Sequence, residues 1–314
     1  MTIAWVIGGN GLLGSALQRS LQRSGTNLFT PVEQFRWKSE SELIVQLETA
    51  VKDFTALVSS ENGWQIYWAA GVGTMGSEGT ALTIETQILS TLLSFIESEQ
   101  GLIAAEGCFV FASSAGAIYA GVTKDIITEK TPAAPTTAYA REKLKQESLI
   151  SAFANNNCKV SALLARISTL YGPGQANGKQ QGIFSEIARR ILRNQPIQIY
   201  VPFDTIRDYI TADDAANTII ACTRAIREKQ GVFTKIIASE LPTTIAEIIS
   251  IYKRIARRTP RIVISTSNLS SLYNRRIQFH SINAPAIEKR YRTSLFVGIA
   301  QVMAAERSAL TRSR

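Results

Sequence analysis

A tyrosine and a lysine one helical turn apart are the residues of this chain best suited to acid–base chemistry. Tyr139 and Lys143 are four positions apart in a segment with helical periodicity, so their side chains share one helix face. A lysine ammonium beside a phenol favours the phenolate form. Such a tyrosine can take a proton from a hydroxyl group while a hydride leaves the adjoining carbon. The pair alone would equally suit an exposed helix surface, so its meaning depends on the surrounding elements.

A glycine-rich turn near the N-terminus predicts a dinucleotide site. An apolar run precedes the glycines, and leucines at helical spacing follow them, which indicates strand, turn and helix. In such a unit Gly8 makes the tight turn, Gly11 lets the backbone approach a pyrophosphate, and Gly14 allows close packing of helix and strand. The helix start, at Leu12 and Leu13, then presents free N–H groups to the phosphates.

Strands and helices alternate along most of the chain. The expected strands span 3–7, 27–32, 65–68, 108–111, 160–165, 197–201 and 232–237. The expected helices span 40–54, 84–97, 139–153, 180–193, 213–227 and 243–257. This alternation predicts an α/β fold with a doubly wound parallel sheet, which would bring the ends of successive strands to one edge. The segment 171–174 interrupts the pattern, and we place the main domain boundary there.

The order of these motifs resembles the extended short-chain dehydrogenases/reductases, the NAD(P)-dependent sugar-nucleotide epimerase/dehydratase family. The resemblance extends from Gly8 to the tail 293–299. The matching pieces are Gly8/Gly11/Gly14, Trp68-Ala69-Ala70-Gly71, Ser113-Ser114 before Ile118-Tyr119, Glu129, Tyr139 with Lys143, Arg166 with Tyr171-Gly172-Pro173, Arg207-Asp208-Tyr209-Ile210, and Asp213-Asp214. Each piece is common by itself, whereas their order and spacing together are specific.

The resemblance implies a division of labour along the chain. An NAD(P)-binding Rossmann domain would span 1–171, and a smaller C-terminal α/β substrate-binding region would span 172–314, with some segments returning to the Rossmann sheet. Its catalytic residues would be Ser114, Tyr139 and Lys143. Ser114 stands 25 positions before Tyr139 (139 minus 114), similar to the spacing in the family, and Ser113 is the alternative. The resemblance also implies a homodimer.

The same resemblance assigns residues to ligands. NAD or NADP would contact Gly8, Gly11, Leu12, Leu13, Gly14, Glu33, Arg36, Trp37, Trp68, Ala69, Ala70, Gly71, Gln87, Tyr139, Lys143 and Ser168. A nucleotide-sugar substrate would contact Ser114, Thr169 and Arg207, with the Arg207 guanidinium on the diphosphate.

The residues at the end of the second predicted strand do not distinguish between NAD and NADP. Val32 stands where NAD-binding folds often carry an acid for the ribose hydroxyls, and Glu33 follows it. Arg36 and Lys38 lie just beyond, where cations would suit a 2′-phosphate.

Composition narrows the classes of function. Residues 1–157 carry 10 Lys/Arg against 15 Asp/Glu, and residues 158–314 carry 24 against 10. The basic half fits a solvated surface or a pocket for a phosphorylated substrate, and no nucleic-acid motif accompanies it. Three cysteines without a pairing pattern and a single histidine give no metal site and favour the cytoplasm. No signal peptide or membrane span is expected.

Departures from the family pattern narrow the reaction. Ala115-Gly116 follows Ser114 where 4,6-dehydratases of the family carry an acid, no Cys-plus-His pair is evident for epimerisation at C3 and C5, and Thr169 replaces a frequent asparagine. The expected function is C4 epimerisation of a nucleotide sugar through a 4-keto intermediate. An NADPH-dependent 4-keto-sugar reductase is the alternative, favoured if Arg36 and Lys38 bind a 2′-phosphate. A non-catalytic dinucleotide sensor would have no need of Ser114, Tyr139 and Lys143 together.

Overall fold

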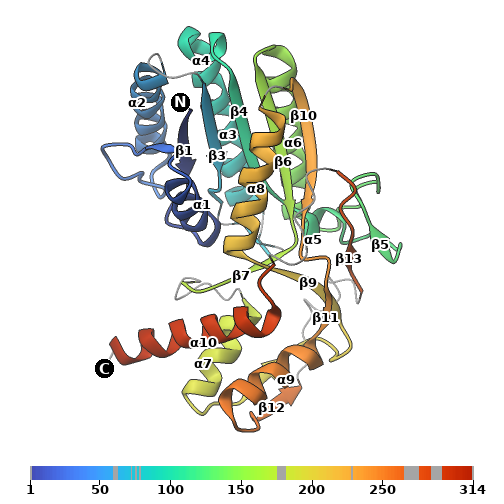
Figure 1. Ribbon diagram of the computed structural model, residues 1–314. Coiled ribbons are helices and arrows are strands. Elements are labelled where there is room, and N and C mark those ends of the chain that lie inside the picture. Colours follow the sequence, from blue (N-terminus) through green and yellow to red (C-terminus); the bar gives the residue numbers. More distant parts are fainter. Residues whose placement is uncertain are drawn as a thin grey trace.

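A computed structural model describes most of the chain, and it divides into a larger and a smaller lobe (Figure 1). The described residues are 2–58, 63–71, 73, 74, 76, 77, 79–174, 182–227, 229–264, 276–283 and 292–312. The helices are α1 (Leu12–Arg23), α2 (Glu40–Val58), α3 (Gly79–Ser98), α4 (Gln100–Ala104), α5 (Ala115–Ile118), α6 (Ala138–Asn156), α7 (Ile183–Leu192), α8 (Ala212–Ile226), α9 (Ile245–Ala256) and α10 (Leu295–Arg312). The strands are β1 (Ile3–Ile7), β2 (Asn27–Phe29), β3 (Trp64–Trp68), β4 (Gly107–Ser114), β5 (Ile126–Ile127), β6 (Val160–Ile167), β7 (Thr169–Tyr171), β8 (Ile197–Ile199), β9 (Ile206–Thr211), β10 (Gly231–Ile237), β11 (Pro242–Thr244), β12 (Ile262–Ile264) and β13 (Gln278–Phe279).

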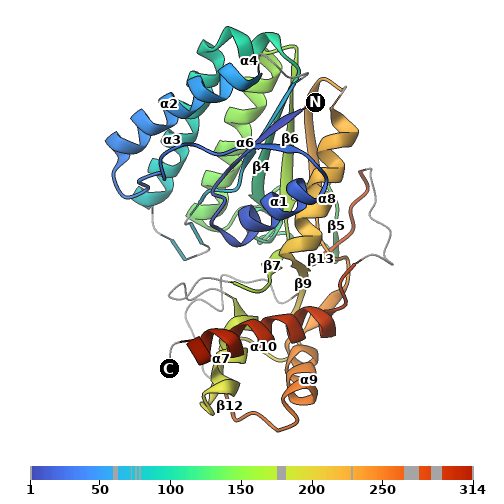
Figure 2. The same cartoon turned by 60° about the vertical axis from the view of Figure 1, so that its left-hand side comes forward.

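The larger lobe is built on a parallel sheet. Within the described residues this sheet has six strands in the order β10-β6-β4-β3-β1-β2. Helices α1 and α8 cover one face, and α2, α3 and α6 cover the other (Figures 1 and 2). Because both faces are covered, the strands are apolar along their length, and β1 and β3 are buried at every position. The predicted doubly wound α/β fold is confirmed.

The strand order sets the place of the site. The chain crosses from β1 to β2 on one side of the sheet and then returns to β3 on the other side of β1. The carboxyl ends of β1 and β3 therefore flank a switch point, where ligands bind in open α/β sheets. The turn 8–11 follows β1 and the segment 69–71 follows β3, so both lie at this edge.

The smaller lobe has its own core. A three-stranded sheet β11-β9-β7 and the pair β12-β8 combine with α7, α9 and α10. Tyr171 stacks on Phe184 with ring centroids 4.3 Å apart, and the Tyr252 hydroxyl donates to the Phe184 carbonyl over 2.6 Å. The C-terminal segment is tied back to α8, since the Thr293 backbone N–H and hydroxyl donate to Asp214 over 2.9 and 3.1 Å.

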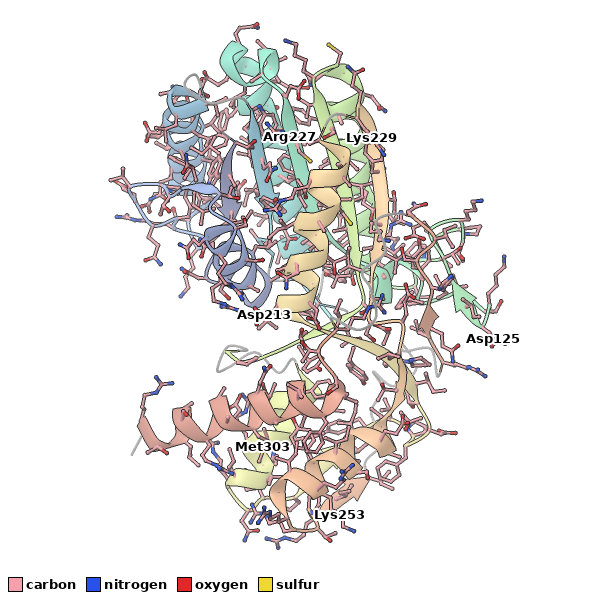
Figure 3. The ribbon with its side chains drawn as sticks, viewed as in Figure 1. Asp125, Asp213, Arg227, Lys229, Lys253 and Met303 are labelled. Atoms are coloured by element: carbon pink, nitrogen blue, oxygen red, sulfur yellow. The ribbon has the colours of Figure 1, made fainter. Side chains whose placement is uncertain are left out.

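The chain returns from the smaller lobe to the large sheet through α8 and β10, which pairs in parallel with β6. The division into regions 1–171 and 172–314 stays a prediction. Figure 3 places Arg227 and Lys229 at one end of the molecule and Lys253 at the other. All three are exposed, so a good part of the basic charge of the second half is spread over the surface.

Element boundaries differ from those expected. The strand predicted over 27–32 ends at Phe29, and the helix predicted from 84 begins at Gly79. Helix α10 and the short strands β5, β7, β9, β11, β12 and β13 were not predicted. The strands are held by pairing with partners distant in the chain rather than by local periodicity. The first residues of the expected helix 180–193 lie outside the described residues, and α7 begins at Ile183. In the described part of the chain, no helix combines the length and hydropathy needed to cross a membrane.

Candidate functional site

The glycine turn after β1 is shaped by two different constraints. Gly8 has φ +89°, and a Cβ there would lie 2.6 Å from the Ala70 backbone nitrogen. A Cβ on Gly14 would lie 2.2 Å from the Gly8 carbonyl oxygen, so this glycine is needed for the helix to approach the turn. A Cβ on Gly11 would meet only the Gly8 carbonyl oxygen, at 3.2 Å. Gly11 caps α1 without a side-chain hydrogen bond, which leaves N–H groups of the first turn free for a ligand.

A large cavity opens beside this turn. It has a volume of about 740 Å³, within the range of small-molecule and cofactor sites. Its walls are the turn itself, the segment that follows β2, the end of β3, and α3. Predicted cofactor residues in its lining are Gly8, Gly11, Glu33, Trp37, Trp68, Ala69, Ala70 and Gly71.

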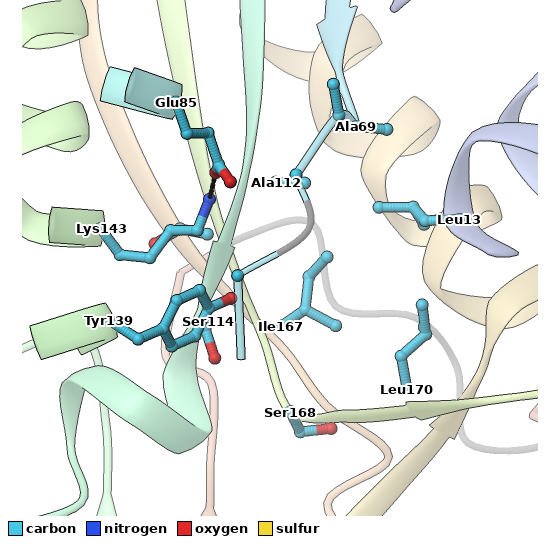
Figure 4. Close-up of a pocket in the computed structure, with 14 residues that line it drawn as sticks. Leu13, Ala69, Glu85, Ala112, Ser114, Tyr139, Lys143, Ile167, Ser168 and Leu170 are labelled. Atoms are coloured by element: carbon cyan, nitrogen blue, oxygen red, sulfur yellow. Dashed lines mark hydrogen bonds and ion pairs between the residues drawn. The ribbon is translucent and has the colours of Figure 1, made fainter. Parts of the chain in front are cut away.

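A smaller cavity of about 200 Å³ adjoins the large one, and the two share Ala69, Ala70, Gly71 and Glu85. The smaller cavity is lined by all three predicted catalytic residues, Ser114, Tyr139 and Lys143, and also by Leu13 and Ser168. Figure 4 shows Ser114, at the end of β4, and Tyr139, in the first turn of α6, side by side at this cavity. The topology thus brings together residues that lie far apart in the sequence.

The neighbouring serine is already bound. The Ser113 hydroxyl donates to Glu147 over 2.6 Å, and Arg166 donates to both oxygens of the same carboxylate over 2.9 and 2.6 Å. Arg166 also donates to the Tyr119 hydroxyl over 2.5 Å. Burial opposes the charge of Arg166, but the hydrogen bonds to Glu147 outweigh it and raise its pKa. This network engages the Ser113 hydroxyl as a donor, whereas the Ser114 hydroxyl accepts from the Ala117 N–H over 3.4 Å. Both serines line the smaller cavity, and the assignment of Ser114 stays a prediction.

Lys143 is held by two side chains. Its Nζ donates to Glu85 Oε1 over 3.0 Å and to Gln146 Oε1 over 2.9 Å, and the ion pair is drawn as a dashed line in Figure 4. The ammonium lies 5.7 Å from the centroid of the Tyr139 ring and 4.9 Å from that of Phe111. Lys143 is 4% exposed, so its charge acts in a low-dielectric setting.

Glu85 was not singled out by sequence reasoning. It lies on α3, where the other buried residues are all apolar: Leu82, Ile88, Leu89, Leu92, Leu93 and Ile96. An acidic residue within an apolar helix face is the signal that could have drawn attention to it. Its partner, Lys143, is 58 positions further along the chain.

The segment after β2 has no acid at the expected position. Val32 is 95% exposed. The Glu33 carboxylate accepts from the Gln46 side chain over 3.1 Å, and Arg36 is paired with Glu42. A hydrogen bond from Ser39 and then one from Arg36 hold the pKa of Glu42 below its usual range. Arg36 therefore already has an acidic partner on α2.

Ser168 follows β6 directly and belongs to the lining of the smaller cavity. Ser168 donates to Asp208 Oδ1 over 2.6 Å, and Ser239 donates its N–H and hydroxyl to the same carboxylate over 2.8 and 2.9 Å. Burial raises the pKa of Asp208 although these hydrogen bonds oppose the rise. Thr169 is exposed on β7, and the Arg207 Nη1 on β9 donates to the Ile206 carbonyl over 2.9 Å.

Six predicted ligand residues lie outside both cavities as the described residues form them: Leu12, Gly14, Arg36, Gln87, Thr169 and Arg207. Gln87 is exposed on α3, on a different side of the helix from Glu85. Their roles toward a ligand stay predictions. Among the described residues, no group of three or more His, Cys, Asp or Glu side chains is placed to hold a metal ion.

A known protein family matches most of the chain. The model of the NAD dependent epimerase/dehydratase family matches residues 4–234. The chain belongs to this family. The matched region contains the glycine turn, both cavities and the predicted catalytic trio, and the family resemblance seen in the sequence is confirmed.

Two curated proteins are similar over part of their length. A dTDP-L-rhamnose 4-epimerase of Burkholderia thailandensis is 30% identical over 94 residues, which are 30% of this chain and 26% of that protein. A dTDP-4-dehydro-6-deoxyglucose reductase of Escherichia coli is 27% identical over 129 residues, 40% of each chain. The match with this family member thus spans about a quarter of the epimerase and two-fifths of the reductase.

The fold of this epimerase/dehydratase family member is also similar to solved structures. MoeE5 in complex with UDP-glucose and NAD superposes with a TM-score of 0.77. It covers 99% of this chain and 100% of its own at 20% identity. At this identity the likeness shows the fold.

Proposed function

We propose that this protein is an NAD(P)-dependent enzyme acting on a nucleotide-activated sugar, and that it inverts the C4 centre through a 4-keto intermediate. The observation that carries the proposal is the single cavity lined by Ser114, Tyr139 and Lys143, which shares a wall with the cavity at the glycine turn. A protein that only bound dinucleotide would have no use for these three side chains in one place.

The larger cavity fits a dinucleotide by the chemistry of its walls. Gly11 keeps the space beside the first turn of α1 open to a pyrophosphate. The residues Trp5 and Trp68 belong to the lining of this cavity and give it an apolar wall. A dinucleotide bound there would accept and return a hydride at a sugar carbon.

The three side chains of the smaller cavity have separable tasks. Tyr139 takes the proton of the C4 hydroxyl as the C4–H bond breaks and a C4 carbonyl forms, and it returns the proton when the carbonyl is reduced from the other face. Ser114 donates a hydrogen bond to the same sugar oxygen. Lys143 places a positive charge beside the phenol and favours its deprotonated form.

The nucleotide sugar is supported by the relatives, a dTDP-L-rhamnose 4-epimerase and a dTDP-4-dehydro-6-deoxyglucose reductase. The test is incubation of the purified protein with UDP- and dTDP-sugars, with NMR of the products. Epimerisation predicts a product inverted at C4 without net consumption of the dinucleotide. Absence of any sugar conversion and of dinucleotide binding would contradict the proposal.

A second candidate, an NADPH-dependent 4-keto-sugar reductase, uses the same three residues. It is favoured by Val32, which is 95% exposed at the place of the ribose-binding acid, and by the cations Arg36 and Lys38 nearby. The Arg36–Glu42 pair weakens this case, because it offsets one of the two charges. Stoichiometric oxidation of NADPH by a 4-keto sugar would select this reaction.

The proposal extends to the oligomeric state and the cellular compartment of the protein. We infer a homodimer in the cytoplasm, with dinucleotide bound by region 1–171 and the sugar nucleotide by region 172–314. Sedimentation of the purified protein tests the first point. A mass of one chain would contradict it.

A further inference from the structure

A buried carboxylate lies where the two cavities meet. Glu85 is 9% exposed and belongs to the lining of both cavities. Its side chain also lies close against Gly71, where a Cβ would come within 2.9 Å of Glu85 Oε1. Removing a carboxylate from water is unfavourable unless a partner compensates its charge, so this position needs a physical explanation.

The compensating partner is the lysine of the candidate catalytic trio. The pair Lys143 Nζ–Glu85 Oε1 is 3.0 Å long with side chains 6% and 9% exposed. Gln146 accepts from the same ammonium over 2.9 Å, and its amide nitrogen lies 3.5 Å from Glu85 Oε1. The head of Lys143 is therefore fixed from α3 and α6, and the pair as a whole carries no net charge.

Other charged groups near this pair are neutralised by partners of their own. Glu142 on α6 accepts from Thr86 over 2.8 Å and from Lys145 over 2.5 Å, and Glu147 is bound by Arg166. Tyr139 is the titratable group on α6 that shares the smaller cavity with the pair. The charge that a ligand meets in this cavity is thus governed by the balance between Lys143 and Glu85.

This balance distinguishes the two redox forms of a nicotinamide dinucleotide. The oxidised ring is a cation and the reduced ring is neutral. An uncompensated ammonium would repel the cationic ring and weaken binding of the oxidised form. A carboxylate beside the ammonium offsets its charge and removes this repulsion. We propose that Glu85 is a positioning residue that holds Lys143 and offsets its charge, so that the site accepts the oxidised dinucleotide.

The inference rests on the proposed function and adds to it, because an epimerase must begin each turnover with the oxidised form. A reductase, by contrast, must begin with the reduced form. The charge balance at Glu85 therefore bears on which of the two reactions the site supports.

The test compares the affinities for NAD+ and NADH by calorimetric titration, or for NADP+ and NADPH if only that pair binds. Glu85→Gln keeps the shape and a hydrogen-bond acceptor but removes the charge. We expect the ratio of oxidised to reduced affinity to fall about tenfold, since a unit charge at this range is only partly screened. Glu142→Gln is the matched control, because it removes a carboxylate from α6 outside both cavities and should leave the ratio unchanged.

A second variant guards against a merely structural effect. Glu85→Gln combined with Lys143→Met restores neutrality, so the ratio should return toward that of the wild type. An equal loss of affinity for both forms in Glu85→Gln, or an unchanged ratio, would overturn the inference while leaving the proposed function intact. A wild-type protein that binds neither form contradicts the proposed function and the inference with it.

Discussion

At the scale of the residue, the site depends on side chains whose neighbours leave them available. Ser113 and Ser114 are adjacent in the sequence and both line the smaller cavity, but the Ser113 hydroxyl donates to Glu147, whereas the Ser114 hydroxyl accepts from the Ala117 N–H. Two glycines of the turn after β1 also differ in what they contact. Gly14 is required by packing against Gly8, while Gly11 borders the space that a ligand would enter.

Tyr139→Phe removes the hydroxyl proposed to carry the proton and keeps the ring. Positioned acid–base groups contribute about 10² to 10⁴ in rate, so we expect kcat to fall by at least this range with little change in Tm. Turnover of the best nucleotide sugar is the measurement. A variant that keeps more than about a tenth of wild-type kcat would exclude the acid–base role.

Gly11→Val should abolish dinucleotide binding while the protein stays folded. The backbone of Gly11 has φ −77°, which valine tolerates, and its side chain would occupy the approach to the first turn of α1. Calorimetric titration measures the binding, and circular dichroism checks the fold. Wild-type affinity in a folded variant would exclude this turn as the pyrophosphate site.

Arg207→Ala tests the proposed diphosphate contact on β9. Loss of a charge-assisted hydrogen bond should weaken nucleotide-sugar binding by about 1.5–3 kcal/mol, roughly tenfold or more. Dinucleotide binding serves as the internal control and should not change. If the sugar nucleotide binds equally well, Arg207 has a structural role.

At the scale of the element, helix α6 is positioned by a buried network rather than by its own propensity. Thr137 caps α6 by accepting from the Ala140 N–H over 3.2 Å, which sets the start of the helix just before Tyr139. Further along, Glu147 ties α6 to β4 through Ser113 and to β6 through Arg166. The cap and these hydrogen bonds fix helix α6 and thereby position Tyr139 and Lys143.

Glu147→Gln should destabilise the protein strongly. The Glu147 and Arg166 side chains are 5% and 13% exposed, and removing one partner leaves a buried cation without its counter-charge. Broken buried pairs cost about 3–5 kcal/mol, which denaturant unfolding can measure. Lys52→Gln breaks an exposed pair with Glu48 that solvent screens, and it should leave the free energy of unfolding almost unchanged. Equal effects of the two substitutions would refute the structural role of Glu147.

At the scale of the whole molecule, the chain passes repeatedly between its two lobes: it leaves the large sheet after β6, returns with α8 and β10, and leaves it again for β11. The segment 212–237 returns to the large sheet as α8 and β10, and Thr293 fastens the C-terminal helix to Asp214 on α8. Arg19 on α1 adds an ion pair of 2.8 Å to Asp213. The Thr293 contacts thus fasten the segment before α10 to α8, and the Arg19 pair fastens α8 to α1.

The reactivity of the three cysteines tests how tightly the folded protein is packed. Burial raises the pKa of Cys108 to about 12 and that of Cys222 to about 11, so both thiols stay protonated, and hence unreactive, at neutral pH. Cys158 is exposed. We expect a thiol reagent at neutral pH to modify Cys158 and spare the other two until denaturant is added. Rapid labelling of all three in the native protein would contradict this packing.

The sequence alone determined the fold class and the glycine turn, since apolar periodicity and glycine spacing are local properties of the chain. It indicated the family through a resemblance in the order of its motifs, which the match of the family model over residues 4–234 confirms. It also singled out Tyr139 and Lys143, because an interval of four residues fixes a shared helix face. Only the tertiary structure shows that the Ser113 hydroxyl donates to Glu147, since Glu147 and its partner Arg166 are distant from Ser113 in the chain. It alone joined Glu85 to Lys143 across 58 positions, because the packing of α3 against α6 is a long-range contact that no local spacing encodes.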